Sequence, residues 1–172
     1  MQLQKATVKD ISTLQIVCFD SYTQVFASHW NENGLELYLE EQFGNARLTI
    51  ELQDTSVEYY FVTYNNENIG FLKINYNSSS KLSKLDNCEL EKIYILPKFS
   101  GMGIGKKAMS EVIKKAVEKD KKLLFLCVID TNVDAIAFYK KLGFQFHSKT
   151  RLEITHFKEE LKGMERMCFP LS

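Results

Sequence analysis

The chain has 172 residues, of which 45% are hydrophobic and 26% charged, which is enough for one domain with a sizeable core. Lys and Arg together number 22, as do Asp and Glu, so the formal net charge is zero. This balance argues against general nucleic-acid binding, which requires a basic excess. No apolar run reaches the roughly 18 residues that cross a membrane. We expect a cytoplasmic chain with residues 1–172 as a single domain, no membrane partner and no nucleic-acid partner.

The cysteines and histidines show no metal-binding pattern. The four cysteines lie far apart without a CxxC pair, which predicts free thiols rather than disulfides. The three histidines share no spacing typical of metal ligands, so no metal is expected.

The N-terminal third is mostly helical in pattern. A short strand is expected first, and then apolar residues recur at spacings of three and four. Thr7, with Asp10 three residues later, predicts an N-cap and an acidic first turn. The expected strand covers 2–7, and the expected helices cover 8–26, 35–43 and 47–53.

From Val57 onward strands predominate. Two runs rich in aromatic and β-branched residues predict a β-hairpin with a four-residue connection at 65–68. The polar, serine-rich stretch 77–87 predicts an exposed loop. The expected strands cover 57–64, 69–76, 88–96, 123–129, 144–148 and 164–171, and the expected helices cover 103–118 and 132–142. This order predicts an α/β (α+β) fold on a mixed sheet.

A glycine-rich turn lies between the strand at 88–96 and the helix that follows. Gly101, Gly103 and Gly105 alternate there, and glycine allows positive φ, so several N–H groups can converge on one point. The first turn of the helix adds unpaired N–H donors and the positive end of its dipole. The turn therefore predicts a site for a phosphate or pyrophosphate. A P-loop does not fit, because Lys107 follows Gly105-Lys106 where Ser or Thr is needed.

A second motif, Asn132-Val-Asp-Ala-Ile-Ala-Phe-Tyr-Lys-Lys-Leu-Gly-Phe144, follows downstream. Together with Ser100-Gly-Met-Gly-Ile-Gly105 it resembles the two cofactor motifs of the GNAT superfamily of N-acetyltransferases. That family usually has Gln or Arg where this chain has Ser100, which weakens one phosphate contact. Lys98, Lys106 or Lys107 are candidates to supply the missing charge. The resemblance covers nearly the whole chain and implies a mixed, mostly antiparallel sheet that is flanked by helices and splayed around acetyl-CoA.

The resemblance also implies roles for single residues. Backbone groups of Ile93, Tyr94 and Ile95 would pair with the pantetheine arm of acetyl-CoA. Asn132 would contact the cofactor, and Lys141 would approach its phosphates. N–H groups from Gly101 to Lys106 would bind the pyrophosphate, through Gly101, Met102, Gly103, Ile104, Gly105 and Lys106.

Two residues are candidates for the chemistry itself. Tyr139 would protonate the departing thiolate, although without the motif around it a packed helix residue is the simpler interpretation. Glu91 is the candidate base: strand alternation puts it on the side of Ile93 and Ile95, where burial would raise its pKa. A solvent-facing carboxylate is the equally weighted alternative for Glu91, and Glu89 is a second choice on the same side.

The acceptor is expected to be a primary amine. Five acids near aromatic residues suit a cationic amine, and several phrases look like the bacterial spermidine/spermine acetyltransferase branch; ordinary helix-surface charge is the alternative. The acids are Asp20, Glu32, Glu36, Glu40 and Glu41. A protein or peptide N-acetyltransferase and a non-catalytic acyl-CoA-binding module stay open, and so does a homodimer paired through the C-terminal strand. The sequence gives neither the physiological acceptor nor the oligomeric state.

Overall fold

The computed structural model of the chain describes residues 1–78, 82 and 86–171. At its centre lies a seven-stranded sheet in the order β1-β2-β3-β4-β5-β7-β6, in which β4 and β5 run parallel and the other neighbouring strands antiparallel. The strands are β1 (Gln2–Lys5), β2 (Val57–Tyr64), β3 (Glu67–Asn75), β4 (Asn87–Ile95), β5 (Leu123–Ile129), β6 (Gln145–Arg151) and β7 (Gly163–Pro170).

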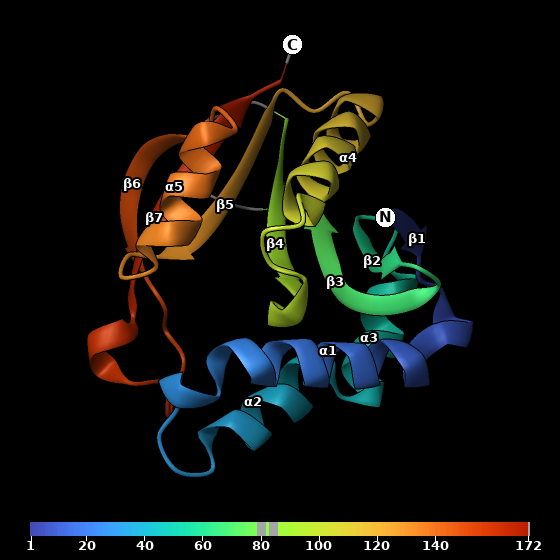
Figure 1. The fold of residues 1–172 in the computed structure, drawn as a ribbon, viewed down its shortest axis with the longest axis vertical. Helices are drawn as coiled ribbons and strands as arrows, with labels where there is room; N and C mark the ends of the chain where they lie inside the picture. Colours follow the sequence, from blue (N-terminus) through green and yellow to red (C-terminus); the bar gives the residue numbers. More distant parts are fainter. Residues whose placement is uncertain (79–81, 83–85, 172) are drawn as a thin grey trace.

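Helices cover both faces of this sheet, and the order of strands and helices matches the predicted one (Figure 1). The helices are α1 (Ile11–Phe26), α2 (Gly34–Phe43), α3 (Asn45–Gln53), α4 (Ile104–Glu118) and α5 (Val133–Lys141). In the described part of the chain, none of them is long and apolar enough to cross a membrane. The predicted mixed, mostly antiparallel sheet flanked by helices is thus confirmed.

Two hydrophobic cores lie on opposite faces of the sheet. On one face α4 packs Ala108 and Val112 into a cluster that includes Leu72 of β3. On the other face α1, α2 and α3 pack against a cluster that includes Phe71. Neighbouring residues of a strand point to opposite faces. The adjacent Phe71 and Leu72 of β3 therefore pack into different cores, one on each face of the sheet.

Three local predictions can be compared with the structure. Thr7 is an N-cap as expected and forms a capping box with Asp10, but Val8–Asp10 is a 3-10 turn, so α1 begins only at Ile11. The hairpin connection has two residues rather than four: Asn65 and Asn66 have φ values of 49° and 62°. Asparagine tolerates this left-handed conformation, which matches the twist of the two strands.

The predicted exposed loop at 77–87 lies partly outside the described residues, at 79–81 and 83–85. Leu82 is 3% exposed and packs near Phe125 and Cys168, and its carbonyl accepts a hydrogen bond from Asn87. At Leu82 the chain is therefore buried rather than exposed. All four cysteines are free thiols, as expected.

β4 and β5 separate after a short paired stretch. Their parallel pairing joins Asn87 to Leu123, Cys88 to Leu124 and Glu89 to Phe125, and from Leu90 onward no described strand pairs with β4 on its β5 side. Figure 1 shows the two strands diverging, with α1 passing below the opening. The predicted splay in the sheet is confirmed, and it leaves one backbone edge of β4 free for a ligand.

The C-terminal strand lies inside the sheet rather than at its edge. β7 pairs with β5 on one side and with β6 on the other. Over Met164–Cys168 both of its backbone edges are therefore occupied within the chain, and the homodimer that the sequence leaves open stays a prediction.

Candidate active site

Two adjoining cavities lie at the opening between β4 and β5. The larger, of about 730 Å³, lies where β4 leads into α4, and the smaller, of about 250 Å³, lies between the diverging strands. Val25 of α1 and Ile95 of β4 line both cavities. One elongated ligand can therefore extend from the start of α4 into the gap in the sheet.

The glycine-rich turn forms a wall of the larger cavity. Gly101 and Gly103 have φ values of 76° and 73°, and a Cβ atom built on either would meet no other atom within 4 Å. Directly after them, the first turn of α4 presents N–H groups without helical partners. The turn therefore has open space and backbone donors together, which is what a phosphate group requires.

Two of the predicted cradle residues behave differently from expectation. Gly105 lies inside α4 without a positive φ, and a Cβ there would meet the Phe138 ring at 3.4 Å. A Cβ atom at that distance makes ordinary van der Waals contact, so this position requires glycine neither for a positive φ nor for space. The Met102 side chain is 49% exposed and lines neither of the two cavities. Only the backbone N–H of Met102 therefore remains a candidate for binding the pyrophosphate.

Lysines supply the positive charge near Ser100, which lines the larger cavity. Lys106 and Lys141 line it as well. Lys98 is instead paired with Glu67 at 3.0 Å, and Lys107 lines a different cavity beside β1. Of the three lysines predicted to compensate for Ser100, the structure therefore favours Lys106, with Lys141 as a second cation.

The smaller cavity brings together the other predicted residues. Ile93, Tyr94 and Ile95 line it from the free edge of β4, while Asn132 and Tyr139 line it from α5. The Asn132 Oδ1 atom accepts a hydrogen bond from the Ala135 N–H at 3.1 Å and so caps α5. The cap uses the side-chain oxygen of Asn132. Contact between the side-chain nitrogen of Asn132 and the cofactor stays a prediction.

Tyr139 is held by neighbouring rings. Its ring lies edge-on to Phe138 and Phe144, with centroid distances of 5.3 Å and 5.8 Å. Burial raises the pKa of Tyr139 to about 12. Its hydroxyl therefore carries its proton at neutral pH, as a proton donor must.

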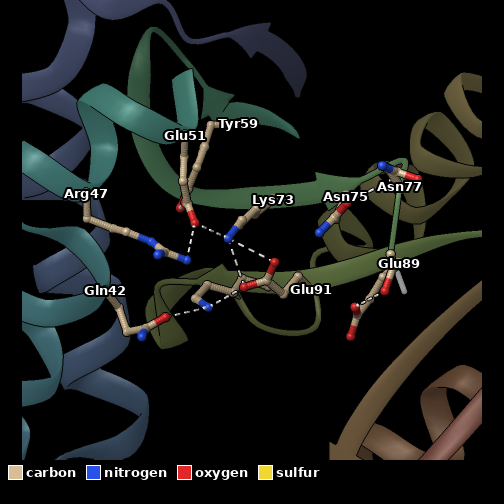
Figure 2. A network of polar contacts seen from close by, with 11 residues as sticks. Gln42, Arg47, Glu51, Tyr59, Lys73, Asn75, Asn77, Glu89 and Glu91 are labelled. Atoms are coloured by element: carbon tan, nitrogen blue, oxygen red, sulfur yellow. Dashed lines mark hydrogen bonds and ion pairs between the residues drawn. The ribbon is translucent and has the colours of Figure 1, made fainter. Parts of the chain in front are cut away.

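Glu91 lines the same cavity but is part of an ion-pair network (Figure 2). Its carboxylate pairs with the buried ammonium groups of Lys73 and Lys92, each at 2.9 Å, and Lys73 also contacts Glu51 at 2.8 Å. Burial alone would raise the pKa of Glu91, but Lys92 and Lys73 outweigh it and hold the pKa at about 2. The expected raised pKa is therefore wrong.

A β-bulge explains the error. Lys73 pairs with Lys92 and Ile74 pairs with Leu90, so Glu91 is the extra residue on β4. The bulge shifts the alternation: Leu90 joins Ile93 and Ile95 in the core on the α4 side, although strict alternation puts it opposite them. Glu91 is thereby set beside two lysines rather than among apolar residues.

We expect Glu91→Gln to lower the free energy of unfolding by about 3 kcal/mol, because it removes the carboxylate paired with the buried Lys92 ammonium, whereas Lys73 keeps Glu51. Folding lowers the pKa of Glu91 from 4.5 to about 2, so this carboxylate stabilises the protein above about pH 5, and that stability is lost as the pH falls toward 2. Urea denaturation at several pH values measures both effects.

Glu89→Gln is the matched control for this substitution. Burial raises the pKa of Glu89, so a neutral side chain suits its surroundings, and the Ser78 hydroxyl that donates to it at 2.9 Å can donate to an amide as well. We expect no loss of stability at neutral pH. Equal destabilisation by the two variants would contradict the role assigned to the lysine pairs.

The acids predicted to form an acceptor wall do not line the smaller cavity. All five are exposed, and Asp20 accepts a hydrogen bond from Gln24 on the surface of α1. The cavity is lined instead by aromatic and aliphatic side chains, including Tyr38 and Phe157, which the sequence analysis did not single out. No local signal connects these two residues, since they lie 119 positions apart and meet only through the fold.

The fold and the site together provide backbone donors at the start of α4 and a free strand edge that leads toward Tyr139. Residues 18–144 match the model of the Acetyltransferase (GNAT) family. The chain belongs to this family, and the resemblance seen in its sequence is confirmed.

Individual relatives are more distant. An uncharacterized N-acetyltransferase of Methanocaldococcus jannaschii is 30% identical over 109 residues, 63% of this chain and 43% of that protein. A spermine/spermidine N(1)-acetyltransferase of Bacillus subtilis is 33% identical over 61 residues, 35% of this chain and 40% of that protein. The chain thus matches less than half the length of these two relatives. A PaiA N-acetyltransferase structure from Thermoplasma acidophilum, in complex with coenzyme A, has a TM-score of 0.75 at 19% identity and covers 98% of both chains.

Proposed function

We propose that the chain transfers the acetyl group of acetyl-CoA to the primary amine of a small molecule. The observation that carries this proposal is that the two cavities adjoin, sharing Val25 and Ile95, with the Gly101–Lys106 turn at one end and Tyr139 at the other. When bound, acetyl-CoA supplies an activated thioester.

The described residues suit three parts of this ligand: the diphosphate, the pantetheine arm and the thioester. Backbone N–H groups of the turn, with Lys106 and Lys141, would hold the diphosphate. The free edge of β4 at Ile93, Tyr94 and Ile95 would hydrogen-bond the pantetheine arm as an added strand does. The same edge can place an N–H group on the thioester carbonyl and stabilise negative charge there.

We assign Tyr139 and Glu91 different roles in the reaction. Tyr139, with a pKa of about 12, keeps a proton that it can give to the departing thiolate. Glu91, with a pKa of about 2, stays ionised and is a weak proton acceptor. We therefore assign Glu91 to hydrogen-bonding and orienting the amine or a water beside it, and the proton of the amine passes on to solvent.

A free-thiol assay tests the proposal. Purified protein should release coenzyme A from acetyl-CoA when a small primary amine is added, and not with peptides. Turnover with peptides alone would support a protein or peptide acetyltransferase. If acetyl-CoA raises the melting temperature while no amine or peptide gives turnover, the chain is an acyl-CoA-binding module and the enzyme proposal fails.

Polyamines are a second candidate class of acceptor. The Bacillus subtilis relative is named for spermine and spermidine, and its matched region is a third of this chain. Spermidine and spermine therefore belong in the assay beside amines that carry a single charge.

A further inference from the structure

Aromatic and aliphatic side chains form the walls of the smaller cavity away from the free edge of β4. They come from α1, α2 and the 152–157 segment between β6 and β7, and comprise Tyr22, Phe26, Tyr38, Leu152, Ile154 and Phe157. The rings contact one another: Tyr22 lies 4.8 Å from Phe26 and 4.9 Å from Tyr38, measured between ring centroids. These contacts fix the shape of the walls.

The walls carry no unpaired negative charge among the described residues. Glu91 is the one carboxylate that lines the cavity, and Lys73 and Lys92 neutralise it. Burial raises the pKa of Tyr22 and of Tyr94, so their phenol groups stay neutral. An ammonium group drawn into this cavity finds aromatic rings but no free carboxylate.

Size and charge point to the same kind of occupant. An apolar cavity of about 150 Å³ is large enough to bind benzene, and this cavity has about 250 Å³, which the acceptor would share with the thioester end of acetyl-CoA. Apolar surface gains free energy on entering such a space, whereas a second charge must give up its water without a partner. The reacting amine escapes this cost because it loses its proton before it attacks the thioester.

We infer that the acceptor is a primary amine with a single charge and an apolar body, either an arylalkylamine or an alkylamine of about six carbons. The inference rests on the proposed function and names the substrate class of the same site. It sets this chain apart from the polyamine class suggested by the Bacillus subtilis relative.

The test compares amines that differ by one charge. Hexylamine and 1,6-diaminohexane have the same carbon chain, and 2-phenylethylamine and spermidine extend the comparison. We expect kcat/KM for hexylamine and 2-phenylethylamine to exceed that for 1,6-diaminohexane and spermidine by at least about tenfold. Calorimetric Kd values for each amine, measured with protein saturated with coenzyme A, should show the same order without any turnover.

The outcomes separate the two proposals. If acetyl-CoA binds but spermidine or 1,6-diaminohexane is the better acceptor, the inference is overturned and the acetyltransferase function stands. If acetyl-CoA binds and none of the four amines reacts, the inference is also overturned. If acetyl-CoA does not bind, the function itself fails and the inference fails with it.

A matched pair of variants tests the cavity wall directly. Ile154 is half-buried and lies outside the helices and strands, so it tolerates a polar replacement better than the core does. Ile154→Glu should shift the hexylamine to 1,6-diaminohexane ratio of kcat/KM about tenfold toward the diamine, because it supplies the missing carboxylate. Ile154→Gln, of equal length but neutral, should lower both values without this shift. An unchanged ratio in Ile154→Glu, with acetyl-CoA affinity retained, would overturn the inference.

Discussion

Replacing Gly103 by aspartate is expected to weaken acetyl-CoA binding at least about 100-fold. Gly103 precedes α4 with φ at 73°, and a Cβ atom there points into open space beside the larger cavity. The new carboxylate would occupy the region proposed for the diphosphate, where like charges repel strongly. It would also compete for the N–H groups at the start of α4. Isothermal titration calorimetry with acetyl-CoA measures the loss.

Gly103→Asn is the control that separates charge from shape. Asparagine has the size of aspartate and tolerates positive φ, but carries no charge. We expect its Kd to stay within about tenfold of the original value. If both variants weaken binding equally, the loss comes from the backbone or from bulk, and the site is not the anion cradle proposed.

Replacing Tyr139 by phenylalanine is expected to lower kcat about 100-fold while the Kd for acetyl-CoA stays nearly constant. Phenylalanine keeps the ring contacts with Phe138 and Phe144 and removes only the hydroxyl. Without that hydroxyl the thiolate must take its proton from water. Stopped or continuous thiol assays give kcat, and calorimetry gives the Kd. An unchanged kcat would remove Tyr139 from the chemistry.

The pH dependence gives a second check on Tyr139. Because burial raises its pKa to about 12, the hydroxyl is protonated throughout the range from about pH 6 to pH 10. Ionisation of Tyr139 should therefore not lower kcat in this range. The pH profiles of kcat for the original chain and for the Tyr139→Phe variant should have the same shape. A basic limb near pH 9 present only in the original chain would contradict the pKa assigned here.

The sequence allowed the order of strands and helices to be predicted, because each element has its own local signal. Hydrophobic periodicity identified α1 and α4, β-branched and aromatic runs identified β2 and β3, and Thr7 with Asp10 marked the first cap. Local signals also led to small errors: the run Asn65–Asn68 looked like a loop, although only Asn65 and Asn66 form the turn.

For the site, the sequence indicated the cradle but not its surroundings. Alternating glycines before a helix are a local pattern that predicts positive φ at Gly101, Gly103 and Gly105, and only Gly101 and Gly103 have it. Anion binding by this turn stays a prediction. The pKa of Glu91 was not predictable, because it depends on a bulge in β4 and on Lys73 from a neighbouring strand.

The sequence alone therefore determined the family and the order of the elements, since these follow from residues close together in the chain. Only the tertiary structure decided that Glu91 is paired with two lysines, that Lys98 is paired with Glu67, and that rings rather than acids line the smaller cavity. Electrostatic and packing energies depend on distances between atoms. Residues of α1, α2, β4 and the 152–157 segment come close to one another only after folding.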